Sequence, residues 1–170
     1  GPQLFPDWMT MSERPYIPRA ASSTAFDSEG VATADRDLIK EGVLTGYVLD
    51  SYSARRLGME TTGNAGGIHN LIVEPGRFSA RELMQQMGTG LLVTEVMGQG
   101  VSMVTGDYSR GAGGFWVENG EIQFPVDEVT IAGNLKDMFM AIEAVGTDVD
   151  DRSGIQSGSI LMGEMTVAGS

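Results

Sequence analysis

Short apolar runs alternate with glycine-containing turns along most of this chain, beginning near Asp37. Leu38–Lys40 and Val43–Leu49 flank the dipeptide Glu41–Gly42, which suits a two-residue hairpin turn. Asn119–Gly120 separates two further runs, and Asn-Gly accepts the positive φ angles of the turn that matches strand twist. The pattern therefore predicts antiparallel strands joined by tight turns.

The remaining apolar runs, four to nine residues long and bounded by turn residues, are also predicted to be strands. Two of them are joined across Gly98–Gly100, and two others form the Asn119–Gly120 hairpin. These expected strands are Ile68–Val73, Leu91–Met97, Val101–Asp107, Phe115–Glu118, Glu121–Val126 and, approximately, Ser159–Val167.

Two short segments carry the start and stop signals of helices. Either of the first two residues of Asp50–Leu57 can cap a short helix, and Gly58 fits the left-handed position just past its end. In Ser79–Met87 a serine followed three residues later by a glutamate forms a capping box, and Gly88 is the expected stop.

A third helix is expected to begin after Asn134 and to end at Gly146. The apolar residues of this segment recur at helical spacing. They are Leu135, Met138, Phe139, Ile142 and Val145. The predicted fold class is therefore α+β, a mostly antiparallel β-sheet with two main helices and one short helix.

Residues 1–30 are expected to form an extended, proline-rich arm or linker, and residues 31–170 the domain proper. Four of the six prolines lie in this arm, and proline fixes φ and favours extended backbone before it. The opening Gly1–Pro2, without a methionine, is interpreted as the scar of a cleaved expression tag. The sequence is then expected to be the C-terminal domain of a larger protein.

The net charge of −12 argues against direct binding of nucleic acid. Phosphate backbones are bound by clustered lysines and arginines, but 11 basic residues here face 23 acidic ones, and the one adjacent basic pair is Arg55–Arg56. No stretch approaches the ~20 apolar residues of a membrane span, and the start of the chain lacks a signal-peptide pattern. The expected location is the cytoplasm, without a membrane partner.

The chain has one histidine, His69, and no cysteine. Disulfides, thiol chemistry and zinc ribbons are thereby excluded, and a zinc peptidase needs more than one histidine. No Gly-x-Ser-x-Gly elbow is present for a serine hydrolase. His69 is expected to be a hydrogen-bonded structural residue, and the chain alone is expected to be neither catalytic nor metal-binding.

Two glycine-rich loops, Thr61–Gly67 and Gly106–Gly114, remain as candidate contact surfaces. Exposed backbone N–H groups in such loops can hold a peptide carboxylate or carbonyl. The alternative is that they are tight corners of a twisted sheet, where glycine fits best. The candidate residues for contact with a peptide or partner are Thr62, Gly63, Asn64, Gly66, Gly67, Thr105, Gly106, Asp107, Ser109 and Arg110.

Several long strings resemble the C-terminal domain of the TldD/PmbA family, specifically its PmbA (TldE) branch. They are DSYSARRLGMETTGNAGG from Asp50, the continuous stretch from MGTGLLVTEVMG to GNLKDM, FDSEGVAT from Phe26 and GSILMGEMTVAG from Gly158. The resemblance covers essentially the whole chain from about Gln3.

The resemblance implies a subunit of a cytoplasmic metallopeptidase complex, also described as a modulator of DNA gyrase, that processes or degrades small, poorly folded peptides. In that family the TldD branch carries an HExxxH zinc motif and pairs with a PmbA-type subunit that lacks it. Zinc is therefore expected in the TldD-type partner and not in this chain. The TldD branch also uses a C-terminal cysteine, which the matching stretch Arg152–Ser159 lacks. No catalytic residue carries over.

Two functional hypotheses follow. The first is a non-catalytic domain that supports a zinc peptidase formed with a TldD-type partner. The second is a homo-oligomeric module that binds peptides or acts as a scaffold without proteolysis, and self-association of the domain stays open. The first also predicts that the two glycine-rich loops converge near a sheet edge, where an extended peptide can add as a strand.

Overall fold

The computed structural model describes residues 1–169, which divide into two compact units. Unit 1 comprises Gly1–Pro75 and Asp148–Gly158, and unit 2 comprises Gly76–Thr147 and the chain from Ser159 onward. Each unit has its own sheets. None of the helices in the described chain is long and apolar enough to cross a bilayer.

Unit 1 is built on a five-stranded sheet in the order β3-β2-β1-β4-β9. Its strands are β1 Met11–Glu13, β2 Arg36–Lys40, β3 Val43–Leu44, β4 Leu71–Val73 and β9 Ile155–Gln156. All neighbours are antiparallel except β4 and β9, which are parallel. The sheet is thus completed by a segment that lies about eighty residues after β4 in the sequence.

The proline-rich segment expected as an arm contributes the central strand of this sheet. β1 pairs with β2 on one side and with β4 on the other. Met9 and Glu13 are 1% and 2% exposed. The expectation of an arm without a packed element is therefore wrong at Met11–Glu13, because this stretch carries no proline and its backbone is free to pair on both sides. The boundary placed at residue 30 stays a prediction.

The first hairpin and the first helix agree with the sequence prediction. Glu41 and Gly42 both have positive φ, at 50° and 75°, as the turn between β2 and β3 requires. The second strand ends at Leu44 and not at Leu49. Helix α1, Ser51–Leu57, is capped by the Asp50 carboxylate, and Gly58 ends it in the left-handed conformation.

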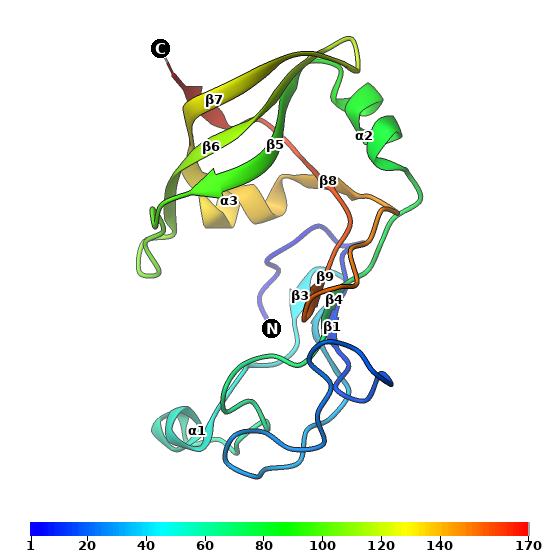
Figure 1. Cartoon of the computed structure of the whole chain (residues 1–170). Coiled ribbons are helices and arrows are strands. Elements are labelled where there is room, and N and C mark those ends of the chain that lie inside the picture. The colour runs from blue at the N-terminus through cyan, green and yellow to red at the C-terminus, as the bar shows by residue number, and fades with distance from the viewer. Residues whose placement is uncertain (170) are drawn as a thin grey trace. The chain divides into compact units, whose positions relative to one another are not determined.

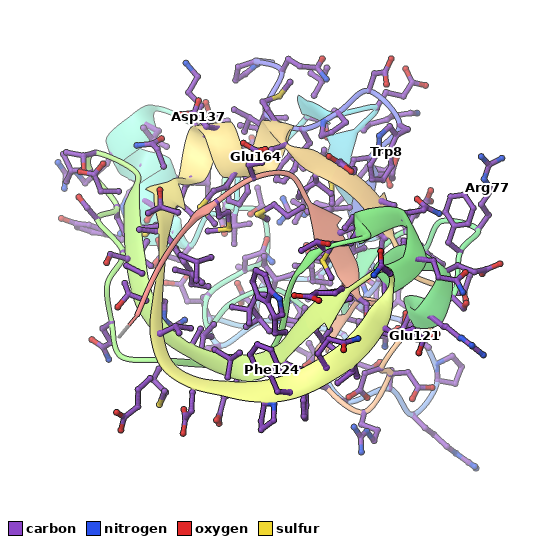
Figure 2. The ribbon with its side chains drawn as sticks, turned by 90° about the horizontal axis from the view of Figure 1, so that it is seen from above. Trp8, Arg77, Glu121, Phe124, Asp137 and Glu164 are labelled. Carbon is purple, nitrogen blue, oxygen red and sulfur yellow. The ribbon has the colours of Figure 1, made fainter. Side chains whose placement is uncertain are left out.

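Unit 2 consists of a curved four-stranded sheet, a two-stranded sheet and two helices (Figure 1). The larger sheet has the order β11-β7-β6-β5, and β10 pairs with β8 in the smaller one. The elements are α2 Ala80–Met87, β5 Gly90–Met97, β6 Asp107–Glu118, β7 Glu121–Asn134, α3 Leu135–Met140, β8 Ile142–Val145, β10 Ile160–Met162 and β11 Thr166–Ala168. Figure 2 shows Phe124 on β7, Asp137 on α3 and Glu121 at the end of β7 that faces α2.

The Asn119–Gly120 hairpin is confirmed and is much longer than expected. Both turn residues have positive φ, and β6 and β7 pair over 12 and 14 residues. Ala112 and Val117 of β6 are fully buried, so this strand lies at the centre of the core of unit 2.

The strand predicted at Val101–Asp107 is wrong. Val101 makes an isolated bridge to Tyr108, residues 102–106 form a turn, and Asp107 is the first residue of β6. The Gly106 N–H donates to the Ser102 carbonyl at 2.8 Å, and the Thr105 hydroxyl donates to the Asp107 carboxylate at 2.6 Å. Such local hydrogen bonds offer the backbone an alternative to a ladder, so β5 pairs with β6 instead.

The third predicted helix is correct at its start and wrong at its end. Asn134 caps α3 as expected, but the helix ends at Met140 and Ala141 is its C-cap. Ile142–Val145 form strand β8, in which the first and last residues are buried. Ile142 and Val145 are β-branched, which suits a strand. Pairing with β10 supplies the backbone hydrogen bonds that a continued helix would have made within itself.

The final predicted strand is two strands in two different sheets. β10 pairs with β8, and β11 pairs with β7. Between them Gly163 donates its N–H to the Ala141 carbonyl at 2.8 Å. The capping box of α2 is present with both of its hydrogen bonds, as predicted. The three short helices and mostly antiparallel sheets of residues 1–169 make this an α+β chain, as expected.

Candidate functional site

A buried carboxylate fixes the first glycine-rich loop to the sheet of unit 1. One oxygen of Glu13, Oε1, accepts hydrogen bonds from Asn64 Nδ2 at 2.7 Å and from the His69 backbone N–H at 2.8 Å. The other, Oε2, accepts from Arg36 Nε at 2.7 Å. Since Glu13 is 2% exposed, this is a buried ion pair with further donors that compensate the charge.

Arg36 and Asn64 extend this network to the loop backbone. The Arg36 guanidinium donates to the Tyr47 carbonyl at 2.7 Å and to Asn64 Oδ1. The Asn64 amide donates to the Gly67 carbonyl at 3.1 Å, and its oxygen accepts from the Thr62 hydroxyl at 2.7 Å. The polar side chains of Thr62 and Asn64 are therefore engaged within unit 1 and hold the loop in one conformation.

His69 is hydrogen-bonded, as the sequence predicts. Its Nδ1 lies 3.1 Å from Glu13 Oε1. The metallopeptidase resemblance raises the question of zinc, which takes three or four ligands drawn from histidine, cysteine and carboxylates. The one histidine here faces a carboxylate that already accepts from Arg36 and Asn64, and the sequence has no cysteine. These residues do not fit a zinc site, and no chemical step is assigned to one.

Asp27 anchors the same loop from its other side. The Ala65 N–H donates to one carboxylate oxygen at 2.9 Å, and the N–H groups of Glu29 and Val31 donate to the other at 2.9 Å. Burial of Asp27 raises its pKa, but the hydrogen bonds from Ala65, Val31 and Glu29 and the nearby His69 outweigh it, so the pKa is lowered from 3.8. The ionised carboxylate is thus the form that holds the loop.

This arrangement predicts that unit 1 loses stability in acid through Asp27. A carboxyl whose pKa is lower when folded stabilises the fold above its unfolded pKa, and the contribution disappears as pH falls through the folded pKa. Asp27→Asn should lower the urea midpoint of unit 1 at neutral pH. It should also make that midpoint decrease less steeply as the pH is lowered below ~4. Tryptophan fluorescence of a Trp116→Phe chain, where Trp8 reports unit 1, measures this. The exposed Asp151→Asn is the control, and an equal response of both variants would contradict the assignment.

The glycines of the first loop divide into a packed one and two exposed ones. Gly63 has φ of 71°, and a Cβ there would lie 2.5 Å from the Ala32 carbonyl oxygen, so it permits close packing. Gly66 and Gly67, with φ of 102° and 127°, are exposed. Of the residues predicted for peptide contact in this loop, Gly66 and Gly67 are therefore the exposed ones, and the N–H and C=O of Gly67 are both hydrogen-bonded to Asn64.

A shallow hollow lies beside the first loop and α1. It measures about 460 Å³ and includes Thr61, which belongs to the loop. Its lining mixes apolar residues with one residue of each charge. These residues are Val31, Ser51, Ala54, Arg55, Met59, Glu60 and Thr61.

The second predicted loop lies in unit 2, at the start of β6. The Asn134 amide donates to the Thr105 carbonyl at 3.0 Å, and the Leu135 N–H donates to the Gly106 carbonyl at 2.7 Å. Asp107 accepts from the Thr105 hydroxyl, as described above. These contacts fix the turn to the start of α3.

Ser109 and Arg110 continue the second loop into β6. The Ser109 N–H donates to the Gly100 carbonyl at 2.7 Å, and Arg110 donates weakly to the carbonyls of Met97 and Val96, each at 3.4 Å. Arg110 also lines a shallow hollow of about 310 Å³ together with Gly98, Gln99 and Val101. Because the first loop belongs to unit 1 and the second to unit 2, their convergence on one surface stays a prediction.

Most residues that fix the first loop carry no local signal in the sequence. Glu13 lies in a segment read as an arm, and Arg36 opens a strand without any motif around it. Asp27 carries a usable signal, since Asp-Ser-Glu-Gly is a turn sequence in which the aspartate bonds to backbone N–H groups farther along. No local pattern indicates that Glu13 and Arg36 meet, because 23 residues separate them.

Comparison with known proteins places this geometry in a family. The sequence profile of the PmbA/TldA metallopeptidase C-terminal domain matches residues 1–169. Metalloprotease PmbA of Escherichia coli O157:H7 is 59% identical over 169 residues, covering 99% of this chain and 38% of that protein. The Metalloprotease PmbA homolog of Haemophilus influenzae is 58% identical over 172 residues, with 99% and 38% covered.

Solved structures agree with the sequence match. The TldE structure from Thermococcus kodakarensis has a TM-score of 0.85 and 26% identity, and the comparison covers 99% of this chain and 41% of that one. A candidate modulator of DNA gyrase from Bacteroides thetaiotaomicron has a TM-score of 0.92 and 31% identity, with 99% and 38% covered. The chain spans about two-fifths of the length of these proteins. It therefore belongs to the PmbA/TldD metallopeptidase family and corresponds to the C-terminal domain of the PmbA branch.

Proposed function

We propose that this chain is the C-terminal domain of a non-catalytic PmbA-type subunit, which supports a cytoplasmic zinc peptidase formed with a TldD-type partner. The substrates of the pair are small, poorly folded peptides. The zinc and the residues that activate water belong to the partner in this proposal. The alternative remains a homo-oligomeric module that binds peptides without cleaving them.

This proposal is supported by the hydrogen bonds of the side chains that could otherwise bind a metal or act as a general base. The one imidazole of the chain lies against Glu13, and the Glu13 carboxylate is neutralised by Arg36 and bonded to Asn64. A general base or metal ligand needs a lone pair free for substrate or metal. In this network the polar groups serve to shape a loop, which suits a supporting subunit better than a catalytic one.

In this proposal the two glycine-rich loops present main chain to the peptide or to the partner. Thr62, Gly63 and Asn64 hold the shape of the first loop, and Gly66 supplies its exposed backbone. The N–H and C=O of the neighbouring Gly67 are bonded to Asn64 and help to fix that shape. In the second loop Thr105, Gly106 and Asp107 fix the turn, the exposed Ser109 follows in β6, and Arg110 borders the hollow at its side. Contacts to main chain are tolerant of sequence, as a peptidase with varied substrates requires.

Co-expression of the full-length parent with a TldD-type protein from the same cell tests the proposal. We expect the two to copurify, and the pair to cleave an unstructured peptide such as a casein fragment. Cleavage should stop with EDTA and return with zinc, because catalysis belongs to the metal of the partner. The 170-residue chain alone should cleave nothing.

Variants of the loops extend the same assay. Gly67→Val alters the backbone of the first loop, because valine is strained at a φ of 127°, and Ser109→Tyr adds bulk at an exposed position of the second loop. Loss of cleavage with copurification retained supports a peptide-facing loop, and loss of copurification supports a partner-facing one. If the parent never associates with a TldD-type protein, the scaffold alternative is favoured. Peptide cleavage by the isolated chain in EDTA would overturn the proposal.

A further inference from the structure

The turn that follows β5 carries main-chain N–H groups that have no acceptor. Gly98 and Gln99 come directly after Met97, the last residue of β5, and both are exposed. Within residues 1–169 the N–H groups of Gly98 and Gln99 donate no hydrogen bond. A Cβ at Gly98 would meet no atom within 4 Å, so the space beside this amide is open. The turn therefore offers two adjacent donors to a ligand.

Two glycines hold this turn in a shape that side chains would disfavour. Gly98 has a φ of 76°, in the left-handed region. A Cβ at Gly100 would overlap the Ser109 carbonyl oxygen, and the Gly100 carbonyl accepts the Ser109 N–H at 2.7 Å. The turn is therefore held closely against the start of β6. Successive N–H groups in a turn with a left-handed residue form a concave site for anions.

Arg110 of β6 supplies a positive charge beside these donors. Together with Gly98 and Gln99 it lines the hollow of about 310 Å³ described above. Arg110 belongs to none of the ion pairs between residues 1–169. Its two hydrogen bonds, to the carbonyls of Met97 and Val96, measure 3.4 Å, whereas such bonds are usually about 2.9–3.0 Å long. The guanidinium is therefore held weakly and keeps donors for an anion.

We infer that the Gly98–Gln99 turn and Arg110 form a binding site for a carboxylate carried by a peptide. A carboxylate accepts several hydrogen bonds at once, and those from a guanidinium are strengthened by charge. This inference rests on the proposed function, which makes peptides the ligands. It narrows the ligands to peptides with a free carboxylate, either at the C-terminus or on an acidic side chain.

The charge balance favours a carboxylate over a phosphate group. Arg110 is the one cation among the residues that line the hollow, and the whole chain has a net charge of −12. A phosphate group carries about two negative charges and is repelled by this net charge more strongly than a carboxylate. A C-terminal carboxylate is present in every unmodified peptide, so recognition of this group is compatible with varied sequences.

The test is a titration of the ¹⁵N-labelled 170-residue chain, followed by NMR, with three peptides. Ac-Ala-Val-Ala-OH has a C-terminal carboxylate, Ac-Ala-Val-Ala-NH2 has no carboxylate, and Ac-Ala-Glu-Ala-NH2 has one on its side chain. We expect the first to shift the amide signals of Gly98 and Gln99 to saturation and the second to leave them unchanged. A response to the third peptide adds acidic side chains as a source of the carboxylate.

Variants of Arg110 then test the guanidinium. Arg110→Gln should raise the Kd for Ac-Ala-Val-Ala-OH at least about tenfold, because hydrogen bonds to charged groups are the strong ones. Arg110→Lys keeps the charge but loses the planar fork, so its Kd should lie between those of the wild type and Arg110→Gln. The matched control, Lys136→Gln, removes the same charge from an exposed position of unit 2 and should change Kd less than about twofold.

Four results would overturn the inference. They are equal binding of the first two peptides, amide shifts that do not include Gly98 and Gln99, an unchanged Kd in Arg110→Gln, and tighter binding of inorganic phosphate than of Ac-Ala-Val-Ala-OH. If Arg110→Gln does not fold, Arg110→Lys and the peptide comparison on the wild-type chain decide. The proposed function is tested separately, by copurification with a TldD-type protein, so loss of the carboxylate site leaves that association standing.

Discussion

Replacing Glu13 by alanine is expected to unfold unit 1 at urea concentrations that leave unit 2 folded. The substitution leaves the Arg36 guanidinium without its carboxylate and removes the acceptor for the Asn64 amide and the His69 N–H. Removal of one partner of a buried ion pair costs about 3–5 kcal/mol, because the remaining charge is buried without compensation. That is a large fraction of the stability of a unit of this size.

The two tryptophans allow this effect to be assigned to one unit. Trp8 belongs to unit 1 and Trp116 to unit 2, so Trp116→Phe and Trp8→Phe backgrounds each report a single unit. The matched control is Glu121→Ala, which breaks the exposed ion pair of Arg81 and Glu121, 3.7 Å apart. It should change stability by less than about 1 kcal/mol. A similar small change for Glu13→Ala would show that the buried network does not stabilise unit 1.

Gly114→Ala is expected to destabilise unit 2 selectively. A Cβ at this position would overlap the carbonyl oxygen of Leu92 and lie 2.9 Å from its carbonyl carbon and 3.1 Å from the Thr94 nitrogen. These are backbone atoms of the neighbouring strand, so the strands must separate locally. Overpacking of this kind costs about 1–3 kcal/mol. It should exceed the gain of about 0.4–1 kcal/mol that alanine gives by restricting the unfolded chain.

Gly111→Ala in the same strand is the control. Its Cβ would lie 3.5 Å from the nearest atom, the Cβ of Met97, which is ordinary contact. We expect it to be neutral or slightly stabilising, by up to about 1 kcal/mol. Urea unfolding followed by Trp116 in the Trp8→Phe background compares the two. Equal urea midpoints for both variants would show that β5 and β6 can move apart without loss of stability in unit 2.

Local signals in the sequence were sufficient for turns and helix starts. Glu41–Gly42 and Asn119–Gly120 adopt the positive φ angles that their composition predicts, and the caps at Asp50 and Ser79 are made by the expected side chains. Each of these features depends on residues within four positions of one another. The chemistry of a turn or cap is therefore readable without knowledge of the fold.

Errors arose where the partner of a segment lies far away in the sequence. Ile142 and Val145 are three residues apart, a spacing compatible with a helix, and only pairing of β8 with β10 makes them a strand. Residues 11–13 looked like part of an arm because β2 and β4, which flank them, lie about 25 and 60 residues later. For the same reason the contacts of Glu13 with Arg36 and Asn64 could not be predicted.

The division of the chain into units has a consequence for its synthesis. β4 of unit 1 is made early, but its parallel neighbour β9 leaves the ribosome only after nearly all of unit 2 has been translated. The first part of unit 1 therefore leaves the ribosome with the β4 edge of its sheet unpaired, and this edge stays unpaired while unit 2 is synthesised. Expression of residues 1–75 alone should yield an aggregation-prone fragment, and supplying residues 148–158 as a separate peptide should rescue it.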